Sequence, residues 1–144
     1  MDKLLLKNQL CFPLYLCSKE IIRKYTPFLN KLDLTYTQYI VMMYLWENKE
    51  CNVKELGKTL LLDSNTLTPL LKKLESKNYI TRTKSSNDSR NTIIKITESG
   101  LKLKENALSI PDSITKCVNL SDEEAQTLYK ILYKVLYNIE KEDN

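Results

Sequence analysis

The residues with the clearest potential for chemistry are four cysteines: Cys11, Cys17, Cys51 and Cys117. No Cys-x-x-Cys pair occurs and the chain contains no histidine, which argues against a zinc site and excludes catalysis by a Cys–His or Ser–His pair. We therefore expect no metal site and no catalysis that depends on histidine. The chain is also expected to have no cofactor and no catalytic site and not to be an enzyme, which the fold pattern described below supports. The chemistry that remains is that of the thiols, which either fill apolar space or react with an oxidant.

Cys11 stands near the start of a helix-forming run that also contains Pro13. Proline is best accommodated in a first helical turn, so the helix is predicted to begin near Cys11 or Phe12. Backbone donors at a helix start would stabilise a thiolate. The neighbouring Phe12, Leu14 and Tyr15 would offer an apolar surface to an organic hydroperoxide. From composition alone, packing is the simpler interpretation of this cysteine, and both interpretations remain open.

The length and composition of the chain indicate what kind of fold holds these thiols. A chain of 144 residues is one domain of ordinary size, and its two glycines and four prolines are few enough to favour a mainly helical fold. The net charge of +4 is compatible with nucleic acid as a partner. No apolar run reaches the ~18 residues that span a membrane, and the N-terminal segment lacks a signal-peptide cleavage site. We expect a cytoplasmic protein without membrane association, whose cysteines are free thiols.

Helical periodicity is clear towards both ends of the chain. Apolar residues recur at helical spacings over about residues 8–30 and again over about 98–140. Within the second stretch, Pro111 is expected to end one helix, and Ser121 with Glu124 predicts a capping box for the next. The apolar stripe that follows this box is too extensive for a small domain to cover, which predicts a second subunit.

Residues 52–82 carry the pattern of two short helices joined by a tight turn. Asn52 can cap the first of them. Asp63 could cap the second, but this would put Pro69 inside the helix, where it removes a backbone donor. From local rules alone, we place the start of the second helix at Thr66.

Two β-rich runs, residues 79–84 and 92–97, flank the polar segment SSNDSRN and predict a hairpin directly after these helices. The whole pattern, over about residues 37–97, indicates a winged helix-turn-helix that binds DNA. The start of the second helix would contact bases, lysines would contact phosphates, and an arginine at the wing tip suits the minor groove. The residues expected to do so are Ser64, Asn65, Thr66, Thr68, Lys72, Lys73, Lys84 and Arg90. The alternative is an α+β domain whose hairpin has no role with DNA.

The segment from residue 52 to residue 100, in which NDSRN leads into ITESG, resembles the MarR family of transcriptional regulators. The resemblance implies one MarR-like domain over the whole chain, mainly α with a small β-hairpin wing, in which Asp88 holds Arg90 in place. It implies a homodimer, built from the N- and C-terminal helical stretches, that binds pseudopalindromic double-stranded operator DNA. It also implies that Pro69 does lie within the recognition helix.

The segments NQLCFPLY, YTPFLNKLDLTYTQY, LWE and LLLDSNTLTPLLKKLE are similar to those of OhrR-type organic hydroperoxide sensors. This likeness implies that Cys11 is the redox sensor, and that Tyr25 and Tyr36 hydrogen-bond its thiolate across the dimer interface. Cys117, in IPDSITKCVNL, looks like the resolving cysteine of the two-cysteine members. The implied function is a repressor that releases its operator when an organic hydroperoxide oxidises Cys11.

Other interpretations stay open. A MarR-type regulator could respond to a phenolic ligand or to general thiol stress, and a small thiol peroxidase could use Cys11 catalytically, although a peroxidase has no use for a wing. Cys117 could be a thiol without a role, because a sequence cannot show that two sulfur atoms approach each other. Cys17 is interpreted as helix packing, and Cys51 as a semi-exposed structural residue.

Overall fold

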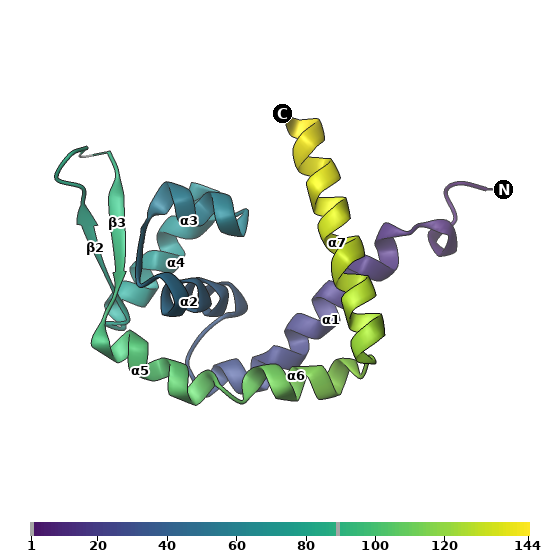
Figure 1. Cartoon of the computed structure of the whole chain (residues 1–144), viewed down its shortest axis with the longest axis horizontal. Coiled ribbons are helices and arrows are strands. Elements are labelled where there is room, and N and C mark those ends of the chain that lie inside the picture. Colours follow the sequence, from purple (N-terminus) through teal and green to yellow (C-terminus); the bar gives the residue numbers. More distant parts are fainter. Residues whose placement is uncertain (1, 89) are drawn as a thin grey trace. The chain divides into compact units, whose positions relative to one another are not determined.

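The computed structural model describes residues 2–88 and 90–144, which divide into two compact units, one ending at Ile110 and one beginning at Pro111. The fold is mainly helical with a small antiparallel sheet (Figure 1), which confirms the predicted fold class. The helices are η1 (Leu6–Asn8), α1 (Cys11–Asn30), α2 (Tyr36–Asn48), α3 (Val53–Leu60), α4 (Ser64–Ser76), α5 (Glu98–Ala107), α6 (Ile110–Val118) and α7 (Asp122–Asp143). The strands are β1 (Glu50–Asn52), β2 (Ile80–Lys84) and β3 (Thr92–Ile96).

Polar side chains fix where the helices begin. Thr35 and Gln38 form a capping box at the start of α2, in which each side chain accepts a hydrogen bond from the backbone of the other residue. The predicted box of Ser121 and Glu124 forms at the start of α7. α1 begins at Cys11, as the position of Pro13 predicts. These signals are local, so the sequence alone carries them.

Two expectations about prolines are wrong. α4 begins at Ser64 and not at Thr66, because the Asp63 carboxylate accepts a hydrogen bond from the Thr66 backbone and fixes the first turn there. Pro69 therefore lies inside α4, as the family resemblance implies. Pro111 does not end a helix but lies in the first turn of α6, where its missing N–H removes no helical hydrogen bond.

The sheet has one strand more than the predicted hairpin. Its order is β1–β3–β2, with all pairs antiparallel, and Cys51 on β1 lies opposite Ile94 on β3. The expectation that Cys51 is semi-exposed is wrong, because this pairing buries it to 7% exposure. The side chains of Ile80, Ile94 and Ile96 are buried on the face of the sheet that packs against the core.

The core of the first unit lies between the helices and this face of the sheet. α2 is buried on several sides, as its nearly continuous apolar sequence predicts. α4 contributes four buried leucines, and the C-terminal end of α1 packs on α2. The most deeply buried side chains of the unit include Leu29, Met42, Leu45, Leu56, Leu67, Leu71 and Leu74.

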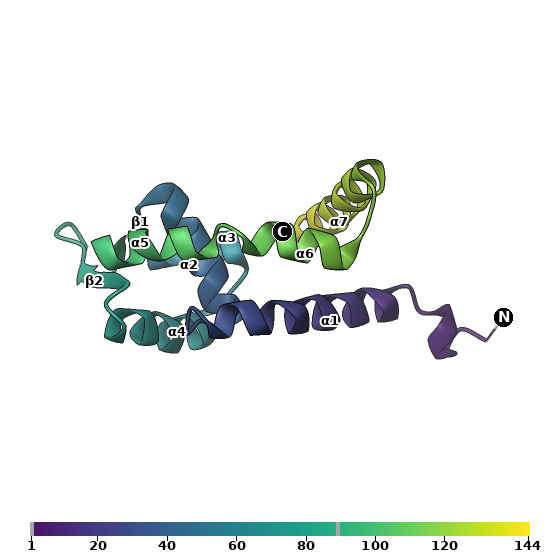
Figure 2. The ribbon, with the colours of Figure 1, turned by 90° about the horizontal axis from the view of Figure 1, so that it is seen from below.

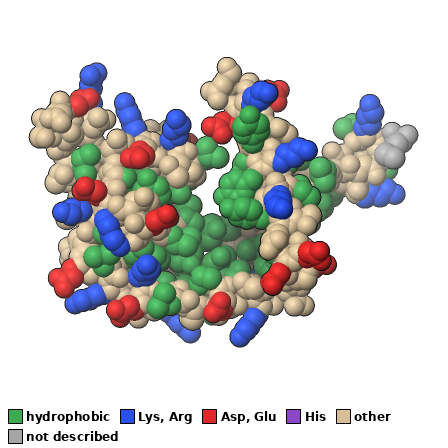
Figure 3. Space-filling view, in the orientation of Figure 1, with side chains coloured by type: hydrophobic (Ala, Val, Ile, Leu, Met, Phe, Trp, Pro, Cys, Tyr) green, Lys and Arg blue, Asp and Glu red, His purple; other side chains and the backbone are tan. Residues whose placement is uncertain are grey.

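In the second unit, α7 leaves an apolar stripe exposed in the single chain. Hydrophobic side chains lie at its surface among charged ones (Figure 3). Within the described residues, no helix is both long enough and apolar enough to cross a membrane. The exposed large side chains of α7 are Leu128, Tyr129, Ile131, Tyr133, Val135, Leu136, Tyr137 and Ile139.

Candidate functional site

α3 and α4 form a helix-turn-helix with a tight connection. Asn52 caps α3 by accepting a hydrogen bond from the Glu55 backbone, as predicted for this position. The chain then reverses at Leu61, which adopts a left-handed conformation with φ 52°. The carbonyl of Leu62 lies 2.9 Å from where a Cβ on Gly57 would be, so the turn depends on glycine at position 57. This turn sets the angle at which α4 leaves α3.

α4 has one apolar face and one polar face. Leu67, Leu70, Leu71 and Leu74 are buried on the first. The six residues predicted to contact DNA are all exposed, which leaves a polar surface on a helix whose buried face is anchored. They are Ser64, Asn65, Thr66, Thr68, Lys72 and Lys73.

The wing is the connection between β2 and β3, and it carries an organised arginine. The Asp88 carboxylate accepts a hydrogen bond of 3.0 Å from the Arg90 backbone, and the same oxygen lies 3.5 Å from Arg90 Nε. Arg90 and Lys84 are both exposed. Asp88 therefore limits the positions that the Arg90 side chain can take, while its guanidinium stays open to a ligand.

Arg82 has a role that the sequence pattern does not reveal. Its guanidinium lies 3.0 Å from a Glu75 carboxylate oxygen, and this ion pair joins β2 to the last turn of α4. The hydrogen bond from Arg82 holds the pKa of the Glu75 carboxyl below its ordinary value. Arg82 Nε is buried and has no hydrogen-bond partner in the described part of the chain. This arginine holds the wing against the recognition helix.

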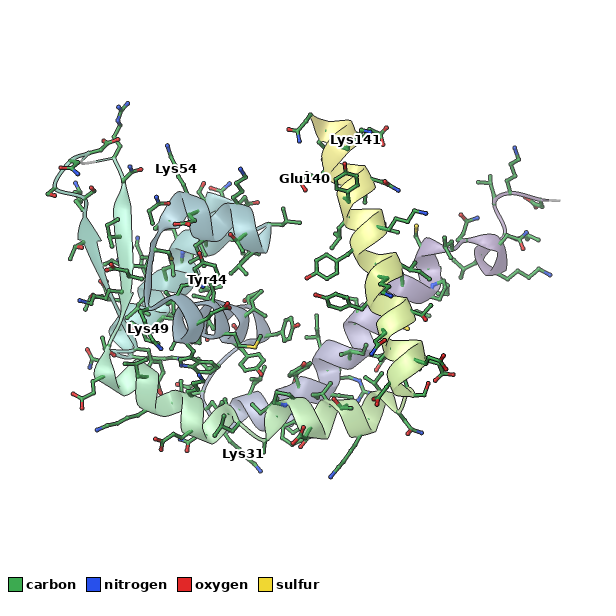
Figure 4. The ribbon with its side chains drawn as sticks, viewed as in Figure 1. Lys31, Tyr44, Lys49, Lys54, Glu140 and Lys141 are labelled. Carbon is green, nitrogen blue, oxygen red and sulfur yellow. The ribbon has the colours of Figure 1, made fainter. Side chains whose placement is uncertain are left out.

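Further lysines lie close to the recognition helix. Lys54, on α3, points away from the fold (Figure 4) and could contact a DNA backbone, although sequence reasoning did not select it. The C-terminal end of α1 meets α4 (Figure 2), where a polar hollow of about 470 Å³ is lined in part by Asn30, Lys73 and Lys77. Lys77 donates to the backbone carbonyl of Asp33 and lies 3.3 Å from its carboxylate. Lys73 is exposed beside Lys77, and no ion pair engages it among the residues that the structure describes.

Cys11 is the first residue of α1 and its thiol is exposed in the single chain. Tyr25 and Tyr36, the two tyrosines predicted to bind the thiolate, lie together with ring centroids 5.1 Å apart. Tyr39 joins them, with centroids 5.8 Å from Tyr25 and 6.3 Å from Tyr36. Burial raises the pKa of all three phenols above the ordinary value. Their hydroxyls therefore stay protonated at neutral pH and can donate hydrogen bonds.

The geometry of α1 separates Cys11 from these tyrosines within one chain. Cys11 and Tyr25 lie on the same helix, fourteen residues apart. At 1.5 Å per residue this is about 21 Å along the axis, which is far beyond hydrogen-bond reach. Tyr36 stacks on Tyr25 and is equally remote. A contact between the thiol and these tyrosines requires a second copy of the chain.

The other cysteines are free thiols with different surroundings. Cys17 is exposed on α1 in the single chain, so its interpretation as helix packing stays a prediction about the dimer. Cys117 is exposed on α6, in the second unit. Burial, with a smaller contribution from Glu55, raises the pKa of the Cys51 thiol to about 11. Within residues 2–88 and 90–144, no group of three or more Cys, Asp or Glu side chains is placed to hold a metal ion.

Several known proteins are similar to this chain in sequence and in fold. The family model described as transcriptional regulator SarA/Rot matches residues 23–107. The organic hydroperoxide resistance transcriptional regulator of Bacillus subtilis is 42% identical over 142 residues, which cover 99% of this chain and 97% of that protein. The HTH-type transcriptional regulator SarZ of Staphylococcus haemolyticus is 46% identical, over 92% of this chain and 90% of its own length.

Solved structures of AbfR, a protein of Staphylococcus epidermidis, are also similar. Reduced AbfR bound to DNA has a TM-score of 0.77 at 34% identity, covering 93% of this chain and 94% of that one. Disulfide-formed AbfR has a TM-score of 0.65 at 33% identity, covering 91% and 92%. The relatives are thus transcriptional regulators, and one of them has been observed in several oxidation states.

Proposed function

This chain belongs to the SarA/Rot family of MarR-type winged-helix transcriptional regulators. We propose that it is a repressor, and that it releases its operator when an organic hydroperoxide oxidises Cys11. The observation that carries the proposal is the position of Cys11 at the start of α1, in a chain 42% identical over nearly its whole length to an organic hydroperoxide resistance regulator. The proposed ligands are double-stranded DNA and, as inducer, the hydroperoxide.

The DNA contacts would come from α4 and the wing. The polar face of α4 presents hydroxyls, an amide and two lysines to the major groove. Arg90, positioned by Asp88, would enter the adjacent minor groove, and Lys84 would contact a phosphate. The ion pair between Arg82 and Glu75 would keep these two contacts at a fixed separation. A pseudopalindromic operator would then accept two such surfaces about 34 Å apart.

The active form would be a homodimer. The exposed apolar stripe of α7 needs cover, and α1 also carries exposed Leu14, Tyr15 and Leu16. The separation of about 21 Å along α1 gives an independent reason, because Tyr25 and Tyr36 can serve a thiolate only if that thiolate belongs to the partner. The proposed sensor is therefore complete only in the dimer.

The sensing chemistry is proposed in two balanced steps. The Cys11 thiolate attacks the terminal peroxide oxygen, so that an S–O bond forms, the O–O bond breaks, and the alcohol leaves with a proton taken from solvent. Cys11 becomes a sulfenic acid and the hydroperoxide is reduced. The Cys117 thiolate of the partner then attacks the Cys11 sulfur, so that an S–S bond forms, the S–O bond breaks, and hydroxide leaves to become water.

The proposed disulfide would join α1 of one protomer to α6 of its partner. A bond between these helices would change the distance between the two recognition helices and so their fit to an operator. A tenfold loss of affinity needs only about 1.4 kcal/mol of difference between the two states. A modest rearrangement is therefore sufficient for release.

The test is operator binding by gel shift, with the protein's own upstream region as probe. Wild type, Cys11→Ser and Cys117→Ser are compared with and without cumene hydroperoxide, and each sample is also run on a non-reducing gel. We expect wild type to release DNA and to form a dimer band that dithiothreitol removes, and Cys11→Ser to do neither. If Cys11→Ser releases DNA on addition of the hydroperoxide, Cys11 is not the sensor and a ligand-responsive regulator becomes the better proposal.

A further inference from the structure

Trp46, the one tryptophan of the chain, connects two helices that are far apart in sequence. Its indole Nε1 donates a hydrogen bond of 2.8 Å to the carbonyl of Gly100, across 54 residues, in a buried environment. Trp46 belongs to α2 and Gly100 to α5. A buried indole N–H needs an acceptor, so this bond specifies how α5 lies on α2.

The start of α5 is held closely on its other side. Gly100 has no room for a side chain, because a Cβ there would collide with the Tyr79 carbonyl and lie 2.8 Å from Ile96 Cγ1. The backbone N–H of Thr97 donates to the Tyr79 carbonyl, and the Thr97 hydroxyl donates to the carbonyl of Asn78. The first turn of α5 is therefore fixed to the segment that joins the recognition helix to the wing.

Aromatic rings lead from Trp46 to the tyrosines of the proposed sensor. Tyr39 contacts Trp46 edge-on, with centroids 6.2 Å apart. Tyr39 also contacts both Tyr25 and Tyr36. The four rings form a continuous packed chain from α1, across α2, to the carbonyl of Gly100 on α5. Tyr39 and Trp46 are buried, whereas Tyr25 and Tyr36 are half-buried. A closely packed interior transmits strain between side chains in contact, so a displacement of Tyr39 acts on Trp46.

We propose that Trp46 is a positioning residue that couples the state of the tyrosine cluster to the placement of α5, and through α5 to the recognition helix and wing. The inference rests on the proposed function, since it assumes that oxidation at Cys11 changes the surroundings of Tyr25 and Tyr36. A change in these rings reaches Trp46 through Tyr39, and the indole N–H transmits it to the backbone of α5. The bond acts on the difference between the reduced and oxidised states and not on DNA contact itself.

The test is Trp46→Phe, which keeps an aromatic ring and removes the N–H donor. Operator dissociation constants are measured for the reduced and the peroxide-treated protein, and the ratio between them is the coupling. We expect reduced Trp46→Phe to bind the operator within about twofold of wild type, while its ratio falls by about threefold or more. The matched control is Tyr44→Phe, which removes a hydroxyl from the same helix (Figure 4) outside the ring chain and should keep the wild-type ratio.

The outcomes separate this inference from the proposed function. If wild type itself shows no change in affinity on oxidation, the proposed function fails. If wild type responds and Trp46→Phe keeps the same ratio, the inference alone is overturned. Should Trp46→Phe fold poorly, the single tryptophan of wild type serves as the probe: its emission maximum is expected to shift on oxidation, and in Cys11→Ser it should stay constant. An unchanged wild-type emission overturns the inference.

Discussion

At the scale of single residues, chemistry follows surroundings more than residue type. The four cysteines are alike in the sequence, yet Cys11, Cys17 and Cys117 are exposed while Cys51 is buried on β1, opposite Ile94 of β3. The position of Cys11 at a helix start was predictable, because Pro13 restricts where a helix can begin. The burial of Cys51 was not, because it depends on pairing with Ile94, which lies more than forty residues further along the chain.

The raised pKa of Cys51 predicts slow alkylation. With a pKa near 11, about two units above the ordinary value, roughly a hundredfold less of this thiol is thiolate at pH 8. We expect iodoacetamide to modify native Cys51 very slowly, at a rate that rises until the pH approaches 11. Peptide mass spectrometry after timed labelling measures this, with the urea-unfolded protein as control. A native rate at pH 8 equal to the unfolded rate contradicts the assignment.

The proposed role of Tyr36 predicts a kinetic effect. Tyr36→Phe removes the hydroxyl but keeps the ring that packs on Tyr25. Loss of one hydrogen bond to a thiolate is expected to slow oxidation of Cys11 about tenfold, which corresponds to about 1.4 kcal/mol. The rate is followed by mass spectrometry of the Cys11 peptide after addition of cumene hydroperoxide. Tyr44→Phe, on α2 but outside the tyrosine contacts, is the control, and equal rates in the two variants argue against the role of Tyr36.

At the scale of elements, local signals and distant contacts decide different features. The capping box of Ser121 could be predicted, because both partners lie within four residues. The tendency of Pro69 to lie in a first helical turn predicts a start at Thr66, but the Asp63 cap starts α4 two residues earlier, at Ser64. The strand β1 is only three residues long, and its pairing with β3 leaves no periodic pattern in the sequence. The bond between Trp46 and Gly100 has no local signal at all.

The close fit of α5 predicts that Gly100→Ala is strongly destabilising. A methyl group at this position collides with the Tyr79 carbonyl, which is backbone and cannot rotate away. We expect a loss of about 1–3 kcal/mol in the free energy of unfolding, measured by urea denaturation. Ser99→Ala, at the exposed neighbouring position of the same helix, should change stability by less than about 0.5 kcal/mol. Equal effects in both variants would show that the fit at Gly100 is not tight.

The exposed position of Lys73 on the polar face of α4 predicts a specific salt dependence. If Lys73 contacts a phosphate, Lys73→Gln removes one ionic contact and lowers the slope of log K against log salt by about 0.9. Affinity should fall similarly for operator and unrelated DNA, because phosphates carry no sequence information. Lys130→Gln makes the same change of charge on α7 and should leave the slope unchanged. The prediction fails if the slope of Lys73→Gln equals that of wild type.

At the scale of the whole molecule, the single chain contains the parts of a winged-helix regulator, and the proposed sensor needs a second copy to be complete. The first unit holds the winged helix-turn-helix, the tyrosine cluster and Cys11, and the second holds Cys117 and the exposed stripe of α7. Sequence patterns were sufficient to identify the winged fold and the polar face of α4. The helix predicted over residues 8–30 already separates Cys11 from Tyr25 by about 21 Å. Sequence patterns could not show that Tyr36 and Tyr39 lie against Tyr25, because these contacts join α2 to α1.

The central claim is that oxidation of Cys11 releases the operator, and a stoichiometric titration tests it most directly. Fluorescence anisotropy of a labelled operator is followed while cumene hydroperoxide is added to the reduced protein in fractions of one equivalent per protomer, at fixed salt. We predict that release is complete near one equivalent, that it follows the oxidised fraction of Cys11 measured in the same samples, and that Cys11→Ser stays bound. Release that needs a large excess of hydroperoxide, or that occurs equally in Cys11→Ser, would contradict it.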